Sequence, residues 1–311
     1  MSDATAARPK KIIIDTDPGI DDAMAIFLAL RSPEVELIGL TTIYGNVYTT
    51  LATRNALHLL EVAGRTDILV AVKFHEFIAS LFVFQKGMKL RVANFVNGAD
   101  GLGNQNFPPL PFLIEQANLY PGKVTVVALG PLTNIALALQ QDPAFSKIIG
   151  QIVLLGGAFG VNGHVHPAAE TNVTDIVFTS GADILVVGVN VTHQVVLTDD
   201  HRQKLARSDG KFAQYLCKIL EAYFSFHLGI YIHDPTALLA AVDPSLITYT
   251  ERVVRVQTCG ITRGLTILYN KQKSLMFGEV TEWTAKPKVK VAVTADAPAI
   301  LNLVMERLMD S

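Results

Sequence analysis

Short apolar runs alternate along the chain with longer segments in which apolar residues recur at helical spacing. Runs rich in β-branched residues predict strands that are buried on both faces, and the longer segments predict helices. The predicted strands are residues 12–14, 35–42, 68–72, 124–129, 152–155, 184–189, 253–256, 265–268 and 289–293. The predicted helices are residues 22–30, 50–62, a segment from 132, and residues 199–206, 211–227, 236–242 and 297–309.

This alternation predicts an α/β protein built on a Rossmann-like, mostly parallel sheet with helices on both faces. We find no internal repeat and no low-complexity linker, so a single domain is expected over residues 11–311. The small polar residues at positions 1–10 are expected to form a disordered N-terminal tail. Residues 74–95 contain several phenylalanines without a clear period, which favours plain packing but also allows a pocket cover or a contact between subunits.

Composition narrows the class of protein. The chain has 311 residues, of which 50% are hydrophobic and 17% charged, as expected for a large buried α/β core. A net charge of −2 without a basic run gives no support for a nucleic-acid partner. Because no secretory signal and no apolar stretch of membrane-spanning length is seen, no membrane partner is expected. The two cysteines, Cys217 and Cys259, form no disulfide framework or zinc motif, so the expected location is cytoplasmic.

Carboxylates cluster directly after the first predicted strand. The cluster consists of Asp15, Asp17, Asp21 and Asp22, with Pro18 and Gly19 marking a turn in its middle. Capping of the next helix explains Asp21 or Asp22, because carboxylates complement the helix N-terminus. It does not explain Asp15 and Asp17. Four acids this close repel one another unless a cation joins them, and a hard divalent cation such as Ca²⁺ or Mg²⁺ suits oxygen ligands.

Other polar groups are expected at the same edge of the sheet, where open α/β sheets bind ligands. Asn46 follows the second predicted strand, although an Asn after Gly is commonly a turn residue. The strand at 124–129 ends in a turn, where a free backbone carbonyl at the end of the strand could bind a metal; the alternative is an ordinary strand-turn-helix corner.

Two further pairs of residues carry candidate chemistry. Glu170 and Asn172 would lie on one side of an extended segment, where they could hydrogen-bond vicinal hydroxyls of a sugar. Asp234 precedes Pro235, which places it at a helix entrance, and the adjacent His233 could donate a proton near neutral pH. The alternative for this pair is an N-cap Asp beside a surface His.

Two other protein classes fit the sequence poorly. Asp15 and Asp17 resemble the start of the haloacid-dehalogenase phosphatase signature, which would imply a phosphate ester and Mg²⁺. That signature needs Thr or Val where this chain has Gly19. No G-x-G-x-x-G fingerprint is present, which disfavours a dinucleotide site.

Taken together, these elements resemble the inosine–uridine nucleoside hydrolase family. Residues 15–22 match its N-terminal signature in full, and the elements at 45–46, 129–134, 170–172 and 233–235 follow in the family's order. The resemblance covers residues 11–309, and the C-terminal part is most similar to the plant uridine nucleosidase branch. Departures are Asn97, where the family usually has His, and His164, where it usually has Asn. Segments 108–114, 173–177 and 221–232 also look short, and the last of these would carry part of a flap over the base.

The resemblance implies the nucleoside hydrolase fold and a Ca²⁺-dependent N-ribohydrolase. It would release ribose and a free base from uridine, and from inosine, xanthosine or adenosine, in nucleoside salvage or catabolism. The implied Ca²⁺ ligands are the carboxylates of Asp17, Asp22 and Asp234 and the backbone oxygen of Leu129. Asp17 would also be the general base for the attacking water. A homodimer or homotetramer is implied as well.

The remaining roles are implied for substrate-binding residues. Asp21, Asn46, Glu170 and Asn172 would hold the ribose hydroxyls, and His233 would help the departing base accept a proton. Cleavage of an N-glycosidic bond builds positive charge on the sugar, which a carboxylate-rich pocket stabilises. The alternative is a catalytically impaired homologue that binds ribose or nucleosides, weakened by its shortened flap.

Overall fold

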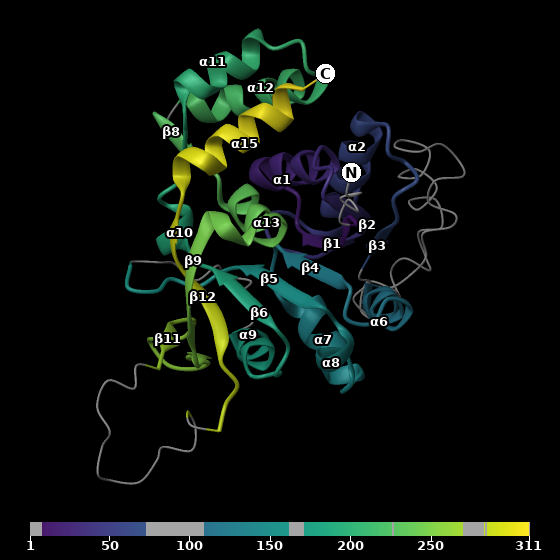
Figure 1. The fold of residues 1–311 in the computed structure, drawn as a ribbon, viewed down its shortest axis with the longest axis vertical. Coiled ribbons are helices and arrows are strands. Elements are labelled where there is room, and N and C mark those ends of the chain that lie inside the picture. Colours follow the sequence, from purple (N-terminus) through teal and green to yellow (C-terminus); the bar gives the residue numbers. More distant parts are fainter. Residues whose placement is uncertain are drawn as a thin grey trace, which may run out of the picture.

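An eight-stranded sheet forms the centre of the protein, with helices on both faces (Figure 1). The structure is a computed structural model that describes residues 8–72, 109–161, 171–225, 227–269, 283 and 285–310. The strand order is β3-β2-β1-β4-β5-β6-β12-β9, and every neighbouring pair is parallel except β12 and β9. The strands are β1 (Lys10–Thr16), β2 (Val35–Thr42), β3 (Val70–Val72), β4 (Val124–Ala128), β5 (Gln151–Leu155), β6 (Ile184–Val187), β9 (Ile247–Arg252) and β12 (Val289–Ala295). The expectation of a mostly parallel α/β fold is confirmed.

Two small antiparallel sheets accompany the central one. They pair β7 (Val196–Thr198) with β8 (Gly229–Tyr231), and β10 (Val254–Val256) with β11 (Thr266–Leu268). The helices are α1 (Ile20–Leu30), α2 (Thr49–Ala63), α6 (Pro109–Leu119), α7 (Thr133–Gln141), α8 (Phe145–Ile148), α9 (Thr171–Phe178), α10 (Val189–Thr192), α11 (Asp199–Arg207), α12 (Lys211–Phe224), α13 (His233–Val242) and α15 (Ala297–Met309), with a 3-10 turn at Pro244–Leu246.

The sheet separates two hydrophobic cores. In β1, Ile12 and Ile14 face the core under α1, α12, α13 and α15, whereas Ile13 faces the core under α6 to α9. All three side chains are fully buried. Side chains alternate between the faces of a strand, so an uninterrupted apolar run is what a strand covered on both faces requires.

Most predicted elements lie within two residues of the observed ones. The predicted strand at 35–42 and helix at 297–309 match β2 and α15 without a shift. Helix α13 begins at His233 rather than at 236, because proline is tolerated in a first helical turn. The elements that were not predicted are strands β7, β8 and β9 and helices α6, α8, α9 and α10. The expected tail and domain boundary stay predictions, since residues 1–7 are outside the described part. The segment 74–95, Asn97 and His164 also lie outside it.

Parallel register brings the carboxyl ends of the central strands to one edge. Asp15 is aligned with Thr41 of β2 on one side and with Ala128 of β4 on the other. The residues that follow β1, β2 and β4 therefore meet at this edge, as the sequence indicated.

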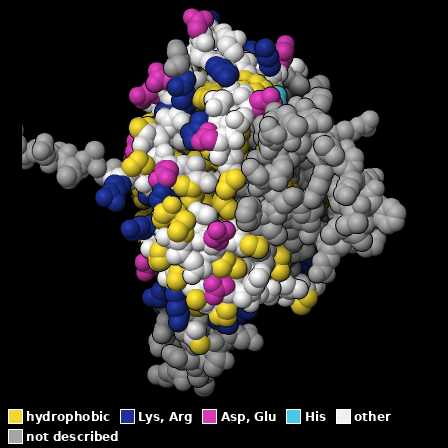
Figure 2. All heavy atoms as spheres, turned by 90° about the vertical axis from the view of Figure 1, so that its right-hand side faces the viewer, with side chains coloured by type: hydrophobic (Ala, Val, Ile, Leu, Met, Phe, Trp, Pro, Cys, Tyr) yellow, Lys and Arg dark blue, Asp and Glu magenta, His cyan; other side chains and the backbone are white. Residues whose placement is uncertain are grey.

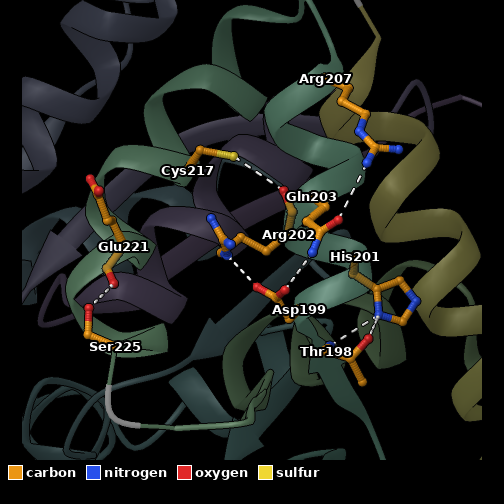
Figure 3. A network of polar contacts seen from close by, with 9 residues as sticks. All are labelled: Thr198, Asp199, His201, Arg202, Gln203, Arg207, Cys217, Glu221 and Ser225. Carbon is orange, nitrogen blue, oxygen red and sulfur yellow. Dashed lines mark hydrogen bonds and ion pairs between the residues drawn. The ribbon is translucent and has the colours of Figure 1, made fainter.

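A polar network between α11 and α12 lies apart from that edge (Figure 3). Arg202 Nε and Gln203 Nε2 each donate to the carboxylate of Asp199 over 2.7 Å, and the Cys217 thiol donates to the backbone oxygen of Arg202. The hydrogen bonds to Gln203 and Arg202 lower the pKa of Asp199. None of the nine residues in Figure 3 lines the described part of the cleft reported below, so we regard the network as structural.

The face drawn in Figure 2 carries interspersed acidic and basic side chains on its described part. Within the part of the chain that the structure describes, no helix combines the length and apolarity needed to cross a lipid bilayer.

Candidate active site

Asp15 is buried and connects several elements at this edge of the sheet by hydrogen bonds. Its side chain is fully buried, and Thr41 and Asn134 donate hydrogen bonds to its Oδ1, the latter over 2.7 Å. Its backbone oxygen accepts from Leu129 N at 2.8 Å and from Gly130 N at 3.2 Å. Asp15 thus joins β1 to β2, to the turn after β4 and to α7, and it is not among the residues that line the described cleft.

Asp17 lies just after β1, where the surrounding backbone approaches its carboxylate closely. Its Oδ2 accepts a hydrogen bond from the backbone N–H of Asn46 at 2.5 Å. A Cβ atom on Gly45 would lie 2.1 Å from Asp17 Oδ2, and a Cβ on Gly130 would lie 2.6 Å from Oδ1. Both glycines are therefore required for the close approach of backbone to this carboxylate.

Asp22 lies in the first turn of α1. Its Oδ1 accepts from the hydroxyl of Thr16, and its Oδ2 accepts from Gly19 N at 3.0 Å and from Asn46 Nδ2 at 3.3 Å. The capping explanation therefore holds in part, because Asp22 does satisfy the backbone N–H that precedes the helix. The Asn46 contact shows that the same carboxylate also faces the group that follows β2.

Three carboxylates from two distant segments meet at this point. Asp21 and Asp22 come from α1 and Asp234 from the first turn of α13, and one oxygen from each lies within 4.8 Å of the others. Asp234 is 2% exposed. The structure thus brings Asp234 to the N-terminal cluster, as the sequence indicated. Asp17 is outside this closest trio, but its charge also acts on Asp234.

Burial and the repulsion of nearby carboxylates make Asp17, Asp21 and Asp234 hard to ionise. Desolvation first, and then the negative charge of Asp22, raise the pKa of both Asp17 and Asp21 to about 7. Desolvation followed by the charges of Asp21 and Asp22 also raises the pKa of Asp234 well above its ordinary value. A bound cation would remove this penalty, because it offsets the negative charge that burial and repulsion disfavour.

The acids line one end of a cleft of about 710 Å³. The predicted residues that border it are Asp17, Asp21, Asp22, Asn46, Leu129, His233 and Asp234. Other residues that line the cleft come from the end of β5, the first part of α9 and the hairpin of β10 and β11. Polar and apolar groups both line it, as is typical of a small-molecule site.

Asn172 is placed differently from the expectation. The extended segment predicted around it is wrong, because Thr171 and Asn172 are the first residues of helix α9 and Asn172 is exposed. Apolar residues at Val173, Ile176 and Val177 give this segment helical spacing. Asn172 is not among the residues lining the described cleft, whereas Thr171 is. Glu170 lies outside the described residues, so the pair is not observed together.

Several residues of the site escaped the sequence analysis. Asn134 was treated as part of a turn, yet it holds Asp15 from α7. Thr192 makes a 2.7 Å hydrogen bond with His233 Nδ1. Arg263 and Thr266 come from the β10–β11 hairpin and also line the cleft. Only the clustering of Thr and Asn after predicted strands could have indicated Asn134, and no local pattern indicated the other three.

An open parallel sheet with a carboxylate-lined cleft at its carboxyl edge defines an α/β protein with an enzyme-like small-molecule site. The profile of the inosine-uridine preferring nucleoside hydrolase family matches residues 12–302. The chain therefore belongs to this family, and the resemblance seen in the sequence is confirmed.

Relatives and solved structures agree. The chain is 64% identical to "Probable uridine nucleosidase 2" of Arabidopsis thaliana, covering 97% of this chain and 98% of the relative. It is 44% identical to "Uridine nucleosidase 1" of the same plant, and the match covers 96% of this chain and 93% of the relative. A solved plant nucleoside hydrolase is 50% identical with a TM-score of 0.83, and the match covers 97% of this chain and 100% of that structure's chain. A purine-preferring ribonucleoside hydrolase from Gardnerella vaginalis is 32% identical with a TM-score of 0.76, and the match covers 96% of this chain and 98% of that structure's chain. The expectation of a nucleoside-hydrolysing enzyme is confirmed.

Proposed function

We propose that this nucleoside hydrolase cleaves the N-glycosidic bond of uridine with the help of Ca²⁺, releasing ribose and uracil. The observation that carries the proposal is the meeting of Asp21, Asp22 and Asp234 within 4.8 Å at one end of the cleft. Two plant relatives that are named uridine nucleosidases support the choice of uridine. We further propose that inosine, xanthosine and adenosine are slower substrates, and that the reaction serves nucleoside salvage or catabolism.

The donor set suits a hard divalent cation. Carboxylate oxygens and a backbone carbonyl are Ca²⁺ ligands, and this group of acids contains no thiolate or imidazole that would favour Zn²⁺. Asp17, Asp22, Asp234 and the backbone oxygen of Leu129 would hold the ion, and all four residues border the cleft. Asp21 belongs to the closest trio and is available to either the ion or the sugar. When bound, the ion would orient a water molecule and make it easier to deprotonate.

Asp17 would take the proton of the attacking water. Its Oδ2 is fixed by Asn46 N and its surroundings are crowded by Gly45 and Gly130, so the carboxylate is held in one position. The remaining acids would stabilise the positive charge that develops on the sugar as the glycosidic bond lengthens. Such charge stabilisation acts in the transition state, which is where it accelerates the reaction.

Ribose recognition is assigned to polar groups around the same point. Asp21 and Asn46 border the cleft and would accept and donate hydrogen bonds to the ribose hydroxyls. Glu170 and Asn172 are retained in this role by the family resemblance alone. His233 borders the cleft next to Asp234 and would give a proton to the departing base.

The assembly and the location remain proposals from the family resemblance. We propose a homodimer or homotetramer, which light scattering on the purified protein measures directly. We also propose a cytoplasmic enzyme, a location compatible with Cys217 and Cys259 being free thiols.

Release of ribose from uridine tests the proposed function. The wild-type protein with Ca²⁺ should release ribose, and Asp17→Ala should lower kcat by about a thousandfold or more, because it removes the general base. Removal of Ca²⁺ by a chelator should abolish the activity, and Ca²⁺ should restore it. If the wild-type protein binds nucleoside and Ca²⁺ but releases no more ribose than Asp17→Ala, the chain is a binding homologue with an impaired site.

A further inference from the structure

The imidazole of His233 is held by a buried hydroxyl that faces it from another element. Thr192, the last residue of α10, is fully buried, and its Oγ1 lies 2.7 Å from His233 Nδ1. His233 borders the cleft, whereas Thr192 is not among the residues that line the described part of it. The hydroxyl therefore contacts the histidine from the protein side and does not compete for the substrate.

The backbone fixes the two residues relative to each other. Strand β7 follows α10 and pairs with β8, with Val196 opposite Tyr231, just before His233. The backbone N–H of Ile232 also donates to the oxygen of Val195 over 3.2 Å. The segments that carry Thr192 and His233 are thus joined by main-chain hydrogen bonds, which do not depend on the identity of either side chain.

Two aromatic rings support the imidazole. The rings of His193 and Tyr231 have their centroids 5.6 Å and 5.9 Å from that of His233, and they lie 4.4 Å from each other. Neither is among the residues that line the described cleft. Packing limits the tilt of the imidazole, but a hydrogen bond to one ring nitrogen is needed to select its tautomer.

We propose that Thr192 is a positioning residue that makes Nε2 of His233 the atom that protonates the departing base; this rests on the function proposed above. The Thr192 oxygen accepts a hydrogen bond from Nδ1–H, so that the neutral ring carries its proton on Nδ1. Nε2 is then the nitrogen that binds and releases the second proton. Without the hydroxyl, the ring loses the bias toward this tautomer and this orientation that Thr192 provides.

The step balances as follows. The C1′–N1 bond of uridine breaks, and its electron pair leaves with uracil. Uracil takes the proton from Nε2 of the imidazolium, which becomes the neutral Nδ1–H tautomer hydrogen-bonded to Thr192. Water adds its oxygen to C1′ and loses its proton to the Asp17 carboxylate. Ribose and neutral uracil are the products.

The leaving group tests this role. Uridine has a poor leaving group that benefits from protonation, whereas p-nitrophenyl β-D-ribofuranoside releases a p-nitrophenolate that does not require it. We compare Thr192→Val, which removes the hydroxyl at nearly constant shape, with Thr192→Ser, which keeps it. The matched control is Thr236→Val in α13, which removes another fully buried hydroxyl whose hydrogen bond goes to Ile232 O at 2.6 Å.

Thr192→Val should lower kcat for uridine by about ten- to a hundredfold, with a change in KM and in p-nitrophenyl riboside hydrolysis of less than about threefold. Thr192→Ser should stay within about threefold of wild type, and Thr236→Val should keep the ratio of the two substrates unchanged. An equal loss on both substrates, or no loss on uridine, would overturn the positioning role. Hydrolysis of neither substrate by the wild-type protein would instead overturn the proposed function.

A spectroscopic measurement tests the hydrogen bond without activity. Nitrogen-15 chemical shifts of the histidines, with His233→Gln used to assign the signal, report which ring nitrogen carries the proton. The neutral His233 should be the Nδ1–H tautomer in wild type and Thr192→Ser, and a mixture in Thr192→Val. A wild-type signal from the Nε2–H tautomer would contradict the proposal even if the enzyme proved inactive.

Discussion

A carboxylate oxygen of Asp22 and one of Asp234 lie within 4.8 Å of each other, although Asp22 lies in the first turn of α1 and Asp234 in the first turn of α13. Both residues border the cleft, so two segments that are distant in the sequence pack together beside it.

We expect Ca²⁺ to stabilise the folded protein through this pair. A ligand that binds only the native state adds about 2.7 kcal/mol at a hundred times its Kd, which a thermal melt detects as a clear rise in Tm. Asp234→Asn keeps the size of the side chain but removes one charge from the group. It should melt at or above the Tm of the wild type in chelator, and it should lose most of the response to Ca²⁺.

Asp67→Asn is the matched control for this change. Asp67 is exposed, is paired with Arg65 at 2.8 Å and is not among the residues that line the described cleft. This variant should keep the full Ca²⁺ response. A full response in Asp234→Asn as well would contradict the assignment of Asp234 as a ligand.

The stability of the metal-free protein should fall as the pH rises from about 4 to about 7. Burial and then the charge of Asp22 raise the pKa of Asp21 from 3.8 to about 7, and Asp17 is raised to about 7 for the same reasons. Between these values the folded state binds more protons than the unfolded state, so each pH increase favours unfolding. The contribution is fully present below about pH 4 and lost above about pH 7.

Comparison of wild type with Asp21→Asn isolates this effect from the other titrating groups. The free energy of unfolding in chelator, measured by denaturant titration at several pH values, should fall less steeply in the variant between pH 4 and pH 7. Parallel curves for the two proteins would show that Asp21 titrates near its ordinary pKa in the fold.

Gly45→Ala should disable the site while leaving the fold intact. The new Cβ would lie 2.1 Å from Asp17 Oδ2 and 3.0 Å from Pro131 Cδ, so the carboxylate must move. A displacement of about 1 Å at a catalytic group costs about a hundredfold in rate. Gly156→Ala, in another glycine that lines the cleft, is the control, since its Cβ would meet nothing closer than 3.6 Å. Equal kcat values for the two variants would argue against a fixed position for Asp17.

Asn134→Ala should destabilise the whole fold and not only the site. The buried amide donates to Asp15 Oδ1 at 2.7 Å and to Thr42 O at 3.3 Å, which ties α7 to β1 and β2. Loss of a buried hydrogen bond to a carboxylate costs about 1.5–3 kcal/mol, measured by urea unfolding. Asn118→Ala is the control, because this amide is exposed and donates to Ile114 O at 2.8 Å, so its loss should cost less than about 0.5 kcal/mol. A similar cost for both variants would contradict the structural role of Asn134.

The sequence determined some features of this protein and the tertiary structure determined others, for physical reasons. The alternation of apolar runs determined the strands and helices, because burial on both faces of a parallel sheet requires runs such as Ile12 to Ile14. The clustering of Asp15, Asp17, Asp21 and Asp22 after a strand determined where the site would lie, since these residues are neighbours in the chain as well as in space. Helix α9 was not predicted, although Val173, Ile176 and Val177 have helical spacing, because the segment is only 8 residues long.

Only the tertiary structure decided which distant side chains face one another. Asn134 meets Asp15 and Thr192 meets His233 because the packing of α7 on the sheet and the pairing of β7 with β8 bring them together. Those distances depend on the packing of whole elements and on main-chain hydrogen bonds, which leave no local pattern near either residue. The sequence by itself identified the acids and the fold, and the packing of the elements decided their geometry, their raised pKa values and the partner of the histidine.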